Sequence, residues 1–136
     1  MDWKECYTKR IVKEVNLDLN LISALIKASK NKFISQTKLG MSEITAAAKL
    51  SLAYDSLREL LEAFTLNEGF KVYNHECYTA FIKEILHENE QGEMFDIIRR
   101  ERNAINYYGK DVSEKDAMML IDEISRLRNF FLDKLK

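Results

Sequence analysis

Apolar residues recur every three or four positions along most of this chain, which is the spacing of helices that bury one face. The first such segment runs from Trp3 to Phe33, and the pattern predicts one long helix there. The spacing lapses over 37–40, after which Ser42 can cap a second helix that ends between Asn67 and Gly69. The stripe expected to be buried in this second helix is Ile44, Ala47, Leu50, Tyr54, Leu57, Leu61 and Phe64.

The segment after the second helix is short and mixed in character. Residues 69–73 have the composition of a strand, but no second strand run pairs with them, so an ordered connector is expected. Asn74 can then accept hydrogen bonds from the free amides of a short third helix over residues 75–88. A polar break at 88–92 separates this helix from the next.

Two further helices complete the pattern. The fourth follows the polar break and is expected to stop at Gly109, which can adopt a positive φ angle. Ser113 with Asp116 three positions later resembles a capping box and starts a fifth. Short loops between long helices favour antiparallel neighbours, so the expected fold is all-α, an up-and-down bundle of about five helices in a single domain over 1–136. The apolar positions of these two helices are Met94, Phe95, Ile98, Ile105, Tyr108, Leu120, Ile124, Leu127, Phe131 and Leu135.

Composition supports a helical fold and removes several classes of function. The 136 residues include no proline and four glycines, which leaves few breaks for a β-rich fold. Lys and Arg number 21 and Asp and Glu 22, so no overall charge draws nucleic acid or an anionic membrane to the chain. Any site for a polyanion must therefore be local. The sequence contains no Gly-rich phosphate loop, serine-nucleophile elbow or dinucleotide fingerprint.

Charge is uneven along the chain although it cancels overall. Residues 50–98 hold three basic and ten acidic side chains, whereas residues 1–49 hold nine basic and five acidic ones. Residues 99–136 hold nine basic and seven acidic side chains. This polarity suits a self-associating or partner-binding protein, and ordinary solvated helix faces give the same pattern.

The location and the cysteines are also constrained by the sequence. Its apolar runs are far shorter than the roughly 18 residues of a membrane span, and its first residues do not resemble a signal peptide. We therefore expect a soluble cytoplasmic protein with no membrane contact. Cys6 and Cys77 lie 71 positions apart, which predicts free thiols in a reducing compartment. With His75 and His87 they match no common zinc-ligand spacing, so neither a metal nor another cofactor is expected.

One position in the fourth helix interrupts its apolar stripe. Arg102 shares a face with Phe95, Ile98 and Ile105, because these residues are spaced by three, four and three. A guanidinium is rarely buried without partners, so an arginine here implies a carboxylate, a carbonyl or an anion beside it, or an opening to solvent. The neighbouring polar positions are Arg99, Asn103 and Asn106, and the helix closes with Tyr107 and Tyr108.

The pattern leaves two interpretations of Arg102 open. In the first, its side chain reaches the edge of the bundle or pairs with an acid of the middle segment, which can be Asp55, Glu59 or Glu62. In the second, the patch of arginine, asparagine and phenol binds a phosphate diester through charge and hydrogen bonds, with a tyrosine stacked on a base.

The segment 99–109, Arg-Arg-Glu-Arg-Asn-Ala-Ile-Asn-Tyr-Tyr-Gly, resembles the signature helix of the HEPN family, the higher eukaryotes and prokaryotes nucleotide-binding domains. That family's motif is an arginine, a polar residue that is often asparagine, three further residues and a histidine. Arg102 and Asn103 match its first two positions, and Tyr107 stands where the histidine belongs. The other stretches that resemble small archaeal and bacterial members are 56–63, 69–72, His75 and Glu76.

The resemblance implies a helical bundle that dimerises along its motif helices, so that two copies of the motif build one composite cleft. Active members of the family are metal-independent endoribonucleases, in which the arginine and the histidine act on the scissile phosphate and the attacking 2′-hydroxyl. A phenol titrates near pH 10 and an imidazole near 6.5, so a tyrosine at the histidine position is a poor general base at neutral pH.

We therefore expect a homodimer that binds RNA or a nucleotide phosphate and cleaves it weakly or not at all. Two alternatives remain, a metal-independent endoribonuclease of the toxin type, and a partner or scaffold of a small nucleotidyltransferase in a toxin-antitoxin system. A phenol can still donate a proton, which keeps the enzyme alternative open. The residues expected to line the groove are Arg99, Arg102, Asn103, Asn106, Tyr107 and Tyr108, with Arg102 and Tyr107 in the catalytic positions.

Overall fold

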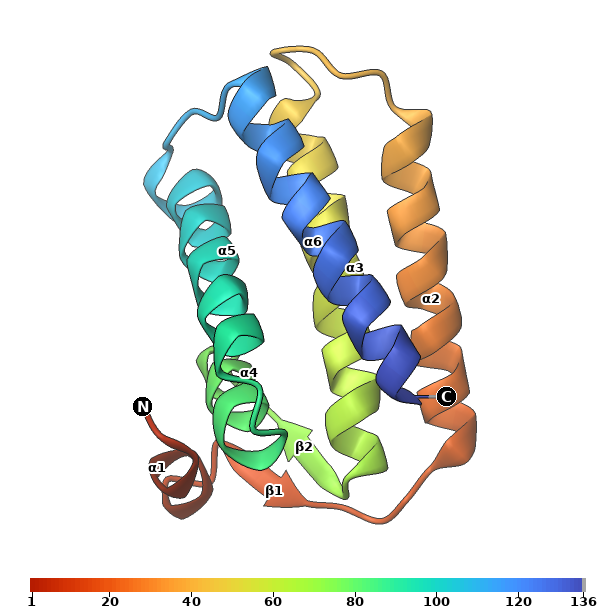
Figure 1. The fold of residues 1–136 in the computed structure, drawn as a ribbon, viewed down its shortest axis with the longest axis vertical. Coiled ribbons are helices and arrows are strands. Elements are labelled where there is room, and N and C mark those ends of the chain that lie inside the picture. Colours follow the sequence, from red (N-terminus) through yellow and green to blue (C-terminus); the bar gives the residue numbers. More distant parts are fainter. Residues whose placement is uncertain (136) are drawn as a thin grey trace.

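In the computed structural model, which describes residues 1–135, long helices run side by side as a bundle, with a short helix and a small hairpin at one end (Figure 1). The long helices are α2 (Leu19–Lys38), α3 (Ala46–Asn67), α5 (Asn89–Tyr108) and α6 (Glu114–Leu135). The short elements are α1 (Trp3–Thr8), β1 (Val12–Glu14), β2 (Phe70–Val72), α4 (Glu76–Ala80) and the π-helical turn η1 (Phe81–Ile85) that continues α4. Helix α3 packs against α2, α5 and α6. The predicted helical bundle is confirmed, and the hairpin is an addition to it.

The first expected helix is wrong in its extent, because the segment from Trp3 to Phe33 divides into α1, β1 and the first part of α2. Arg10 has a left-handed backbone, with φ of 59°, directly after α1. The Oδ1 atom of Asp18 accepts a hydrogen bond from the Leu21 amide at 3.0 Å, and this cap begins α2. Val12, which extends the helical spacing in the sequence, lies in the strand, where β-branched side chains pack well.

The connector expected over residues 69–73 is also wrong, because β2 pairs with β1. The two strands are antiparallel, with Val12 opposite Val72 and Glu14 opposite Phe70. The partner strand lies inside the segment whose spacing predicts the first helix. The sequence pattern alone therefore offers β2 nothing to pair with.

The hairpin brings the two cysteines together. Its antiparallel register sets Val12 opposite Val72, so that the chain before β1, which holds Cys6, lies near the chain after β2, which holds Cys77. The two side chains form a disulfide, with their Cα atoms 6.1 Å apart and both residues fully buried. The expectation of two free thiols is therefore wrong. A separation of 71 positions sets no limit here, because the chain between the cysteines folds back through the two strands.

Two predicted helix caps are confirmed. Gly109 has φ of 68° and ends α5, and the Oγ atom of Ser113 accepts a hydrogen bond from the Asp116 amide at 3.0 Å at the start of α6. The expected cap of the second helix is shifted, because Thr45 and not Ser42 directly precedes α3. In the turn before that helix, the hydroxyls of Ser42 and Thr45 each accept a hydrogen bond from the amide of the other, at 3.1 and 2.9 Å. Cap chemistry read from the sequence therefore fixes the boundaries at Gly109 and Ser113.

The third helix differs from its expected range of 75–88. Its cap is as predicted, since the Oδ1 atom of Asn74 accepts a hydrogen bond from the Glu76 amide at 2.9 Å. The α-helical part ends at Ala80, however, and the chain continues as the π-helical turn η1 to Ile85. The polar break expected at 88–92 falls mostly inside α5, which begins at Asn89.

One main hydrophobic core lies between α3, α5, α6 and the short elements. The spacing places some exposed residues in it wrongly, among them Leu19 and Leu21 at the start of α2, which are 64% and 41% exposed. Ile44 is 91% exposed because it precedes α3, and Tyr108 is 84% exposed because it is the last residue of α5. In the part of the chain that the structure describes, no helix has both the length and the apolar character needed to cross a bilayer. The predicted core positions that are buried include Leu50, Tyr54, Leu57, Leu61, Phe64, Phe95, Ile98, Ile124, Leu127 and Phe131.

Candidate anion-binding site

The interrupted stripe of α5 is present in the structure. Phe95 and Ile98 are fully buried, and Ile105 packs against the edge of the core. The side chain of Arg102, between them on the same face, is only 13% exposed. An ionised group is thus held at the boundary between the core and the solvent, which is costly unless partners compensate for the lost hydration.

The partners of Arg102 compensate for this only in part. Its guanidinium lies over the ring of Tyr54, with Cζ 4.8 Å from the ring centroid, and Nη1 donates a long hydrogen bond of 3.4 Å to the Tyr107 hydroxyl. Nη2 lies 3.7 Å from Oδ1 of Asp55, which is an ion pair beyond ordinary hydrogen-bond distance. The Nε atom is buried and has no hydrogen-bond partner among the described residues. Arg102 therefore keeps unused capacity to bind an anion.

The other two acids considered as partners of Arg102 bind different cations. Glu59 pairs with Lys32 and with Arg58, and Glu62 pairs with Lys71 and with Arg58, whose Nη1 lies 3.3 Å from the Glu62 carboxylate. Of the three predicted acids, only Asp55 forms an ion pair with Arg102.

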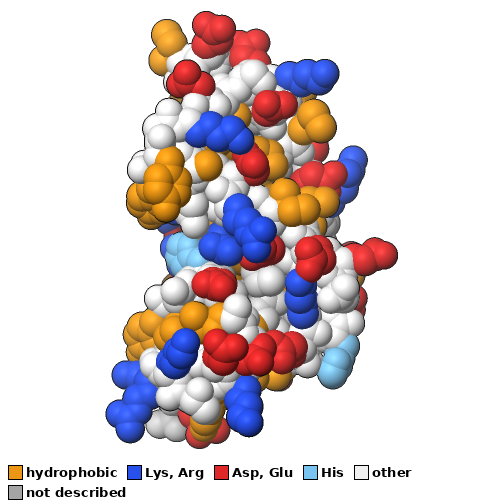
Figure 2. Space-filling view, turned by 90° about the vertical axis from the view of Figure 1, so that its left-hand side faces the viewer, with side chains coloured by type: hydrophobic (Ala, Val, Ile, Leu, Met, Phe, Trp, Pro, Cys, Tyr) orange, Lys and Arg blue, Asp and Glu red, His pale blue; other side chains and the backbone are white. Residues whose placement is uncertain are grey.

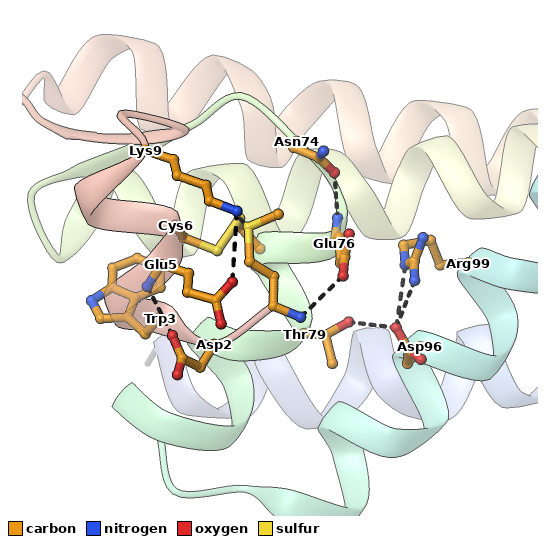
Figure 3. A network of polar contacts seen from close by, with 12 residues as sticks. Asp2, Trp3, Glu5, Cys6, Lys9, Asn74, Glu76, Thr79, Asp96 and Arg99 are labelled. Atoms are coloured by element: carbon orange, nitrogen blue, oxygen red, sulfur yellow. Dashed lines mark hydrogen bonds and ion pairs between the residues drawn. A yellow bond between two sulfur atoms is a disulfide. The ribbon is translucent and has the colours of Figure 1, made fainter.

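Arg99 is held by an acid on its own helix. Its Nη2 donates a 2.9 Å hydrogen bond to Asp96, which also accepts one from the Thr79 hydroxyl at 3.1 Å (Figure 3). Asp96 also pairs with Arg100 at 2.9 Å. Burial by itself raises the pKa of Asp96, but the hydrogen bond and the charge of Arg99 outweigh it and hold that pKa below its usual value. The guanidinium of Arg99 is therefore engaged by Asp96 and is not a free hydrogen-bond donor for a ligand.

The remaining predicted residues are only partly brought together. Asn103 lies next to Arg102, and its Oδ1 atom is 3.5 Å from Nη1 of Arg102. Tyr107 lies beside the same guanidinium, whose Cζ atom is 5.7 Å from the centroid of the Tyr107 ring. Asn106 turns toward α3, where its Oδ1 accepts a hydrogen bond of 3.4 Å from Ser51. Tyr108 is exposed at the end of α5.

Two residues that the spacing does not single out complete the site. The hydroxyl of Tyr54, on the buried face of α3, is hydrogen-bonded to Nδ1 of His75 at 2.9 Å. His75 immediately precedes α4 and is half-buried. The ring of Tyr54 thus contacts both His75 and Arg102, which lie 27 positions apart in the sequence. We call Tyr54, Arg58, His75, Arg99 and Arg102 the arginine–histidine cluster.

The electrostatics of this cluster are positive. Burial, followed by the charges of Arg58 and Arg102, lowers the pKa of His75 from 6.5 to about 4, and Asp55 opposes these effects only weakly. Burial also raises the pKa of the Tyr54 phenol above its usual value. At neutral pH both side chains are therefore uncharged, and of the three arginines near His75, Arg58 and Arg99 are themselves paired with carboxylates. Figure 2 shows Lys and Arg side chains gathered beside a histidine near the middle of the molecular face that it draws.

The side chains near this cluster do not form a metal site. Among residues 1–135, no three side chains of His, Cys, Asp or Glu converge in a way that could hold a metal ion. The two cysteines are already joined in the disulfide. What the cluster offers is guanidinium charge, a neutral imidazole and phenol hydroxyls, which together suit a phosphate or another oxyanion.

Comparison with known proteins does not extend this assignment. No protein-family model matches the chain, and no curated protein or solved structure matches it. The function therefore has to be argued from the site itself.

Proposed function

We propose that this chain is a HEPN-like domain that binds RNA or a nucleotide phosphate at the arginine–histidine cluster, with little or no cleavage. One observation carries the proposal: the guanidinium of Arg102 lies over the ring of Tyr54, whose hydroxyl is hydrogen-bonded to His75, and its nearest carboxylate is 3.7 Å away. The other two arginines of the cluster are held more closely, Arg58 by Glu62 at 3.3 Å and Arg99 by Asp96 at 2.9 Å. A phosphate diester would supply the missing negative charge.

The state of Arg102 supports this proposal. Its nearest carboxylate is 3.7 Å away, and its buried Nε has no partner among the described residues. A phosphate can accept two parallel hydrogen bonds from one guanidinium, which a carboxylate at that distance does not do. Phosphate binding would thus give the Nη atoms of Arg102 closer acceptors than the Asp55 carboxylate.

We further propose that two copies pack along α5 and join their clusters into one composite groove. Tyr107 and Tyr108 are 68% and 84% exposed at the end of α5, which leaves two large rings available to a second subunit or to the bases of a bound strand. Cytoplasmic residence accompanies this function, because RNA and nucleotides are found there. A disulfide is rare in cytosolic proteins of mesophiles, but intracellular proteins of hyperthermophiles commonly contain disulfides.

Fluorescence anisotropy with a single-stranded RNA tests the proposal. We expect binding that weakens between about 50 and 200 mM salt, because phosphate contacts release counterions. Arg102→Ala should reduce affinity at least about ten-fold, since it removes a charged hydrogen-bond donor. Arg126→Ala on α6 is the matched control, because Arg126 is highly exposed and its ion pair is with Glu123 on the same helix. Binding that is independent of salt, or equal in both variants, would reject the proposal.

A second candidate function, a metal-independent endoribonuclease, is favoured by the place of His75. Tyr107 stands where the motif histidine belongs, but the structure has another histidine near Arg102. His75 and Arg102 both contact the side chain of Tyr54. A neutral imidazole can take the proton of a ribose 2′-hydroxyl as it attacks phosphorus and return it to the departing 5′-oxygen. Arg102 would then stabilise the charge on the phosphorane.

Incubation of unstructured RNA with the protein in a chelator separates the two candidates. Products that end in a 2′,3′-cyclic phosphate, formed by the wild type and lost in His75→Gln, would establish the enzyme. Intact RNA that is nonetheless bound would establish the binding protein. Arg102→Ala should abolish either outcome, and its circular dichroism should match that of the wild type.

A further inference from the structure

A second group of basic and aromatic side chains lies on the hairpin, outside the arginine–histidine cluster. Tyr7 and Tyr73 are 46% and 60% exposed, and the Nζ atom of Lys13 lies 5.3 Å from the centroid of the Tyr73 ring. A shallow hollow there is lined by Tyr7, Arg10 and Lys13 together with Thr8, Val12 and Glu14. We call Tyr7, Arg10, Lys13 and Tyr73 the hairpin surface.

The charges of the hairpin surface are not neutralised within the chain. Lys9 nearby pairs with Glu5 at 3.8 Å. Arg10 and Lys13, by contrast, form no ion pair with any residue between 1 and 135. Unpaired cations next to exposed rings are the combination that single-stranded nucleic acids bind, with phosphates on the cations and bases stacked on the rings.

The hairpin surface and the arginine–histidine cluster are close along the chain. Tyr73 follows β2, and its amide donates a hydrogen bond to the Ile11 carbonyl at 2.9 Å, which fixes it to the hairpin. His75 is two residues further on, so the Cα atoms of Tyr73 and His75 are at most about 7 Å apart. His75 contacts Tyr54, whose ring lies against Arg102. An extended strand bound at the cluster would therefore need to cross only a short distance to reach Tyr73.

We propose that a single strand of RNA continues from the arginine–histidine cluster onto the hairpin surface, where Arg10 and Lys13 bind phosphates and Tyr73 stacks against a base. This inference rests on the proposed function and adds to it the class of ligand, an extended single strand longer than a mononucleotide. A folded duplex would not present its bases to Tyr73, whereas an unpaired strand does.

The test compares RNA length with the position of the charge that is removed. Arg10→Gln/Lys13→Gln removes two charges from the hairpin surface, and Lys27→Gln/Lys30→Gln removes two from α2, which lies across the bundle from α5 (Figure 1). Anisotropy is measured with single strands of about 4 and about 16 nucleotides, the usual limits of such binding sites. We expect the hairpin variant to weaken the longer strand about ten-fold and to lower its salt dependence by one to two phosphate contacts, about 0.7–1.4 in the log–log slope. It should leave the shorter strand unchanged.

The ring is tested separately by Tyr73→Leu and Tyr73→Phe. Stacking needs an aromatic face and no hydroxyl, so the leucine variant should weaken the longer strand and the phenylalanine variant should restore binding. The further inference is overturned if Arg102→Ala abolishes binding while the hairpin variants bind both lengths like the α2 control. If no RNA binds the wild type, the proposed function itself fails. Loss of binding to phosphatidylserine vesicles in the hairpin variant, with RNA binding intact, would assign the surface to a membrane and also overturn the inference.

Discussion

The hydroxyl of Tyr54 lies 2.9 Å from Nδ1 of His75. Tyr54 is fully buried on α3, so a core side chain sets the position of a polar group at the surface. Because the face of the same ring lies 4.8 Å from the guanidinium of Arg102, the packing of α3 against α5 also fixes how far apart the imidazole and the guanidinium are. The site is therefore as rigid as the core that holds Tyr54.

The pKa of His75 should be measurable directly. Burial and the charges of Arg58 and Arg102 lower it to about 4, so the side-chain NMR signals of His75 should titrate with a midpoint about there. Phosphate bound at the cluster should raise the midpoint, because its charge offsets the arginines. A midpoint near the value of a free imidazole would show that His75 lies in water, away from the arginines.

The same shift predicts how stability depends on pH. Because the pKa of His75 is lower in the folded chain than in the unfolded one, the unfolded chain binds more protons between pH 6.5 and about 4. The stabilisation is present above pH 6.5 and is lost as the pH falls through this window, by about 1–3 kcal/mol once screening by solvent is allowed for. Urea unfolding at both ends of the window should therefore show a smaller loss in His75→Gln than in the wild type.

Asp55 should compete with the ligand for Arg102. Its carboxylate lies 3.7 Å from Nη2 and is partly exposed, so Asp55→Asn should tighten binding of single-stranded RNA about two- to five-fold. Asp122→Asn removes the same charge from an exposed position on α6 and serves as the control. Weaker binding by Asp55→Asn would show that this carboxylate positions Arg102 and does not compete with the ligand.

Reduction of the disulfide should destabilise the fold. The bond closes a loop over a separation of 71 positions, and chain entropy assigns such a loop about 4 kcal/mol. The free energy of unfolding should drop by roughly this amount in reductant, while a Cys6→Ala/Cys77→Ala variant should not respond to reductant at all. Thiol titration of the denatured, unreduced protein should find no free thiol; two would contradict the pairing.

Phe95 should be the most sensitive apolar position tested on α5. It is fully buried and its ring contacts those of Tyr54 and Tyr78. Phe95→Ala should therefore cost about 3–5 kcal/mol of unfolding free energy. Ile97 on the same helix is 50% exposed, and Ile97→Ala should cost no more than about 1 kcal/mol. Similar losses in the two variants would contradict the orientation of α5.

The proposed dimer can be measured by light scattering after gel filtration. One chain has a mass of 16.0 kDa, so the expected particle has twice that mass. Replacing both exposed tyrosines, Tyr107 and Tyr108, with serine should shift the protein toward the single-chain mass, because the rings are proposed to meet the second subunit. A wild type that remains a single chain at high concentration would remove the composite groove and leave a site within one subunit.

Spacing along a helix predicts one half of the site and misses the other. Arg102 is found because Phe95 and Ile98 define a stripe that it interrupts, and this information is local to α5. The contact of Arg102 with Tyr54 depends on how α3 packs against α5. The contact of Tyr54 with His75 depends on where the chain leaves β2. Such tertiary relationships leave no period in a sequence, which is why Tyr54 reads only as a core residue.

The errors in the fold have a related cause. Residues 11–15 continue a helical spacing, yet three of them form β1, because pairing with β2 and burial of Val12 outweigh local preference. The same pairing brings Cys6 to Cys77. By contrast, the boundaries marked by Gly109 and Ser113 are correct, since a left-handed glycine and a capping hydroxyl act within a few residues.

The bond between Cys6 and Cys77 also changes the topology of the chain. Helices α2 and α3 and both strands lie within a closed covalent ring of residues 6–77, which begins inside α1 and closes inside α4, while residues 1–5 and the chain after Cys77 lie outside it. A pull on the two ends cannot straighten the ring, so the oxidised molecule reaches a fully extended length about 250 Å shorter than the reduced one. A proteolytic cut within the ring would likewise leave both fragments joined until the sulfur bridge is opened.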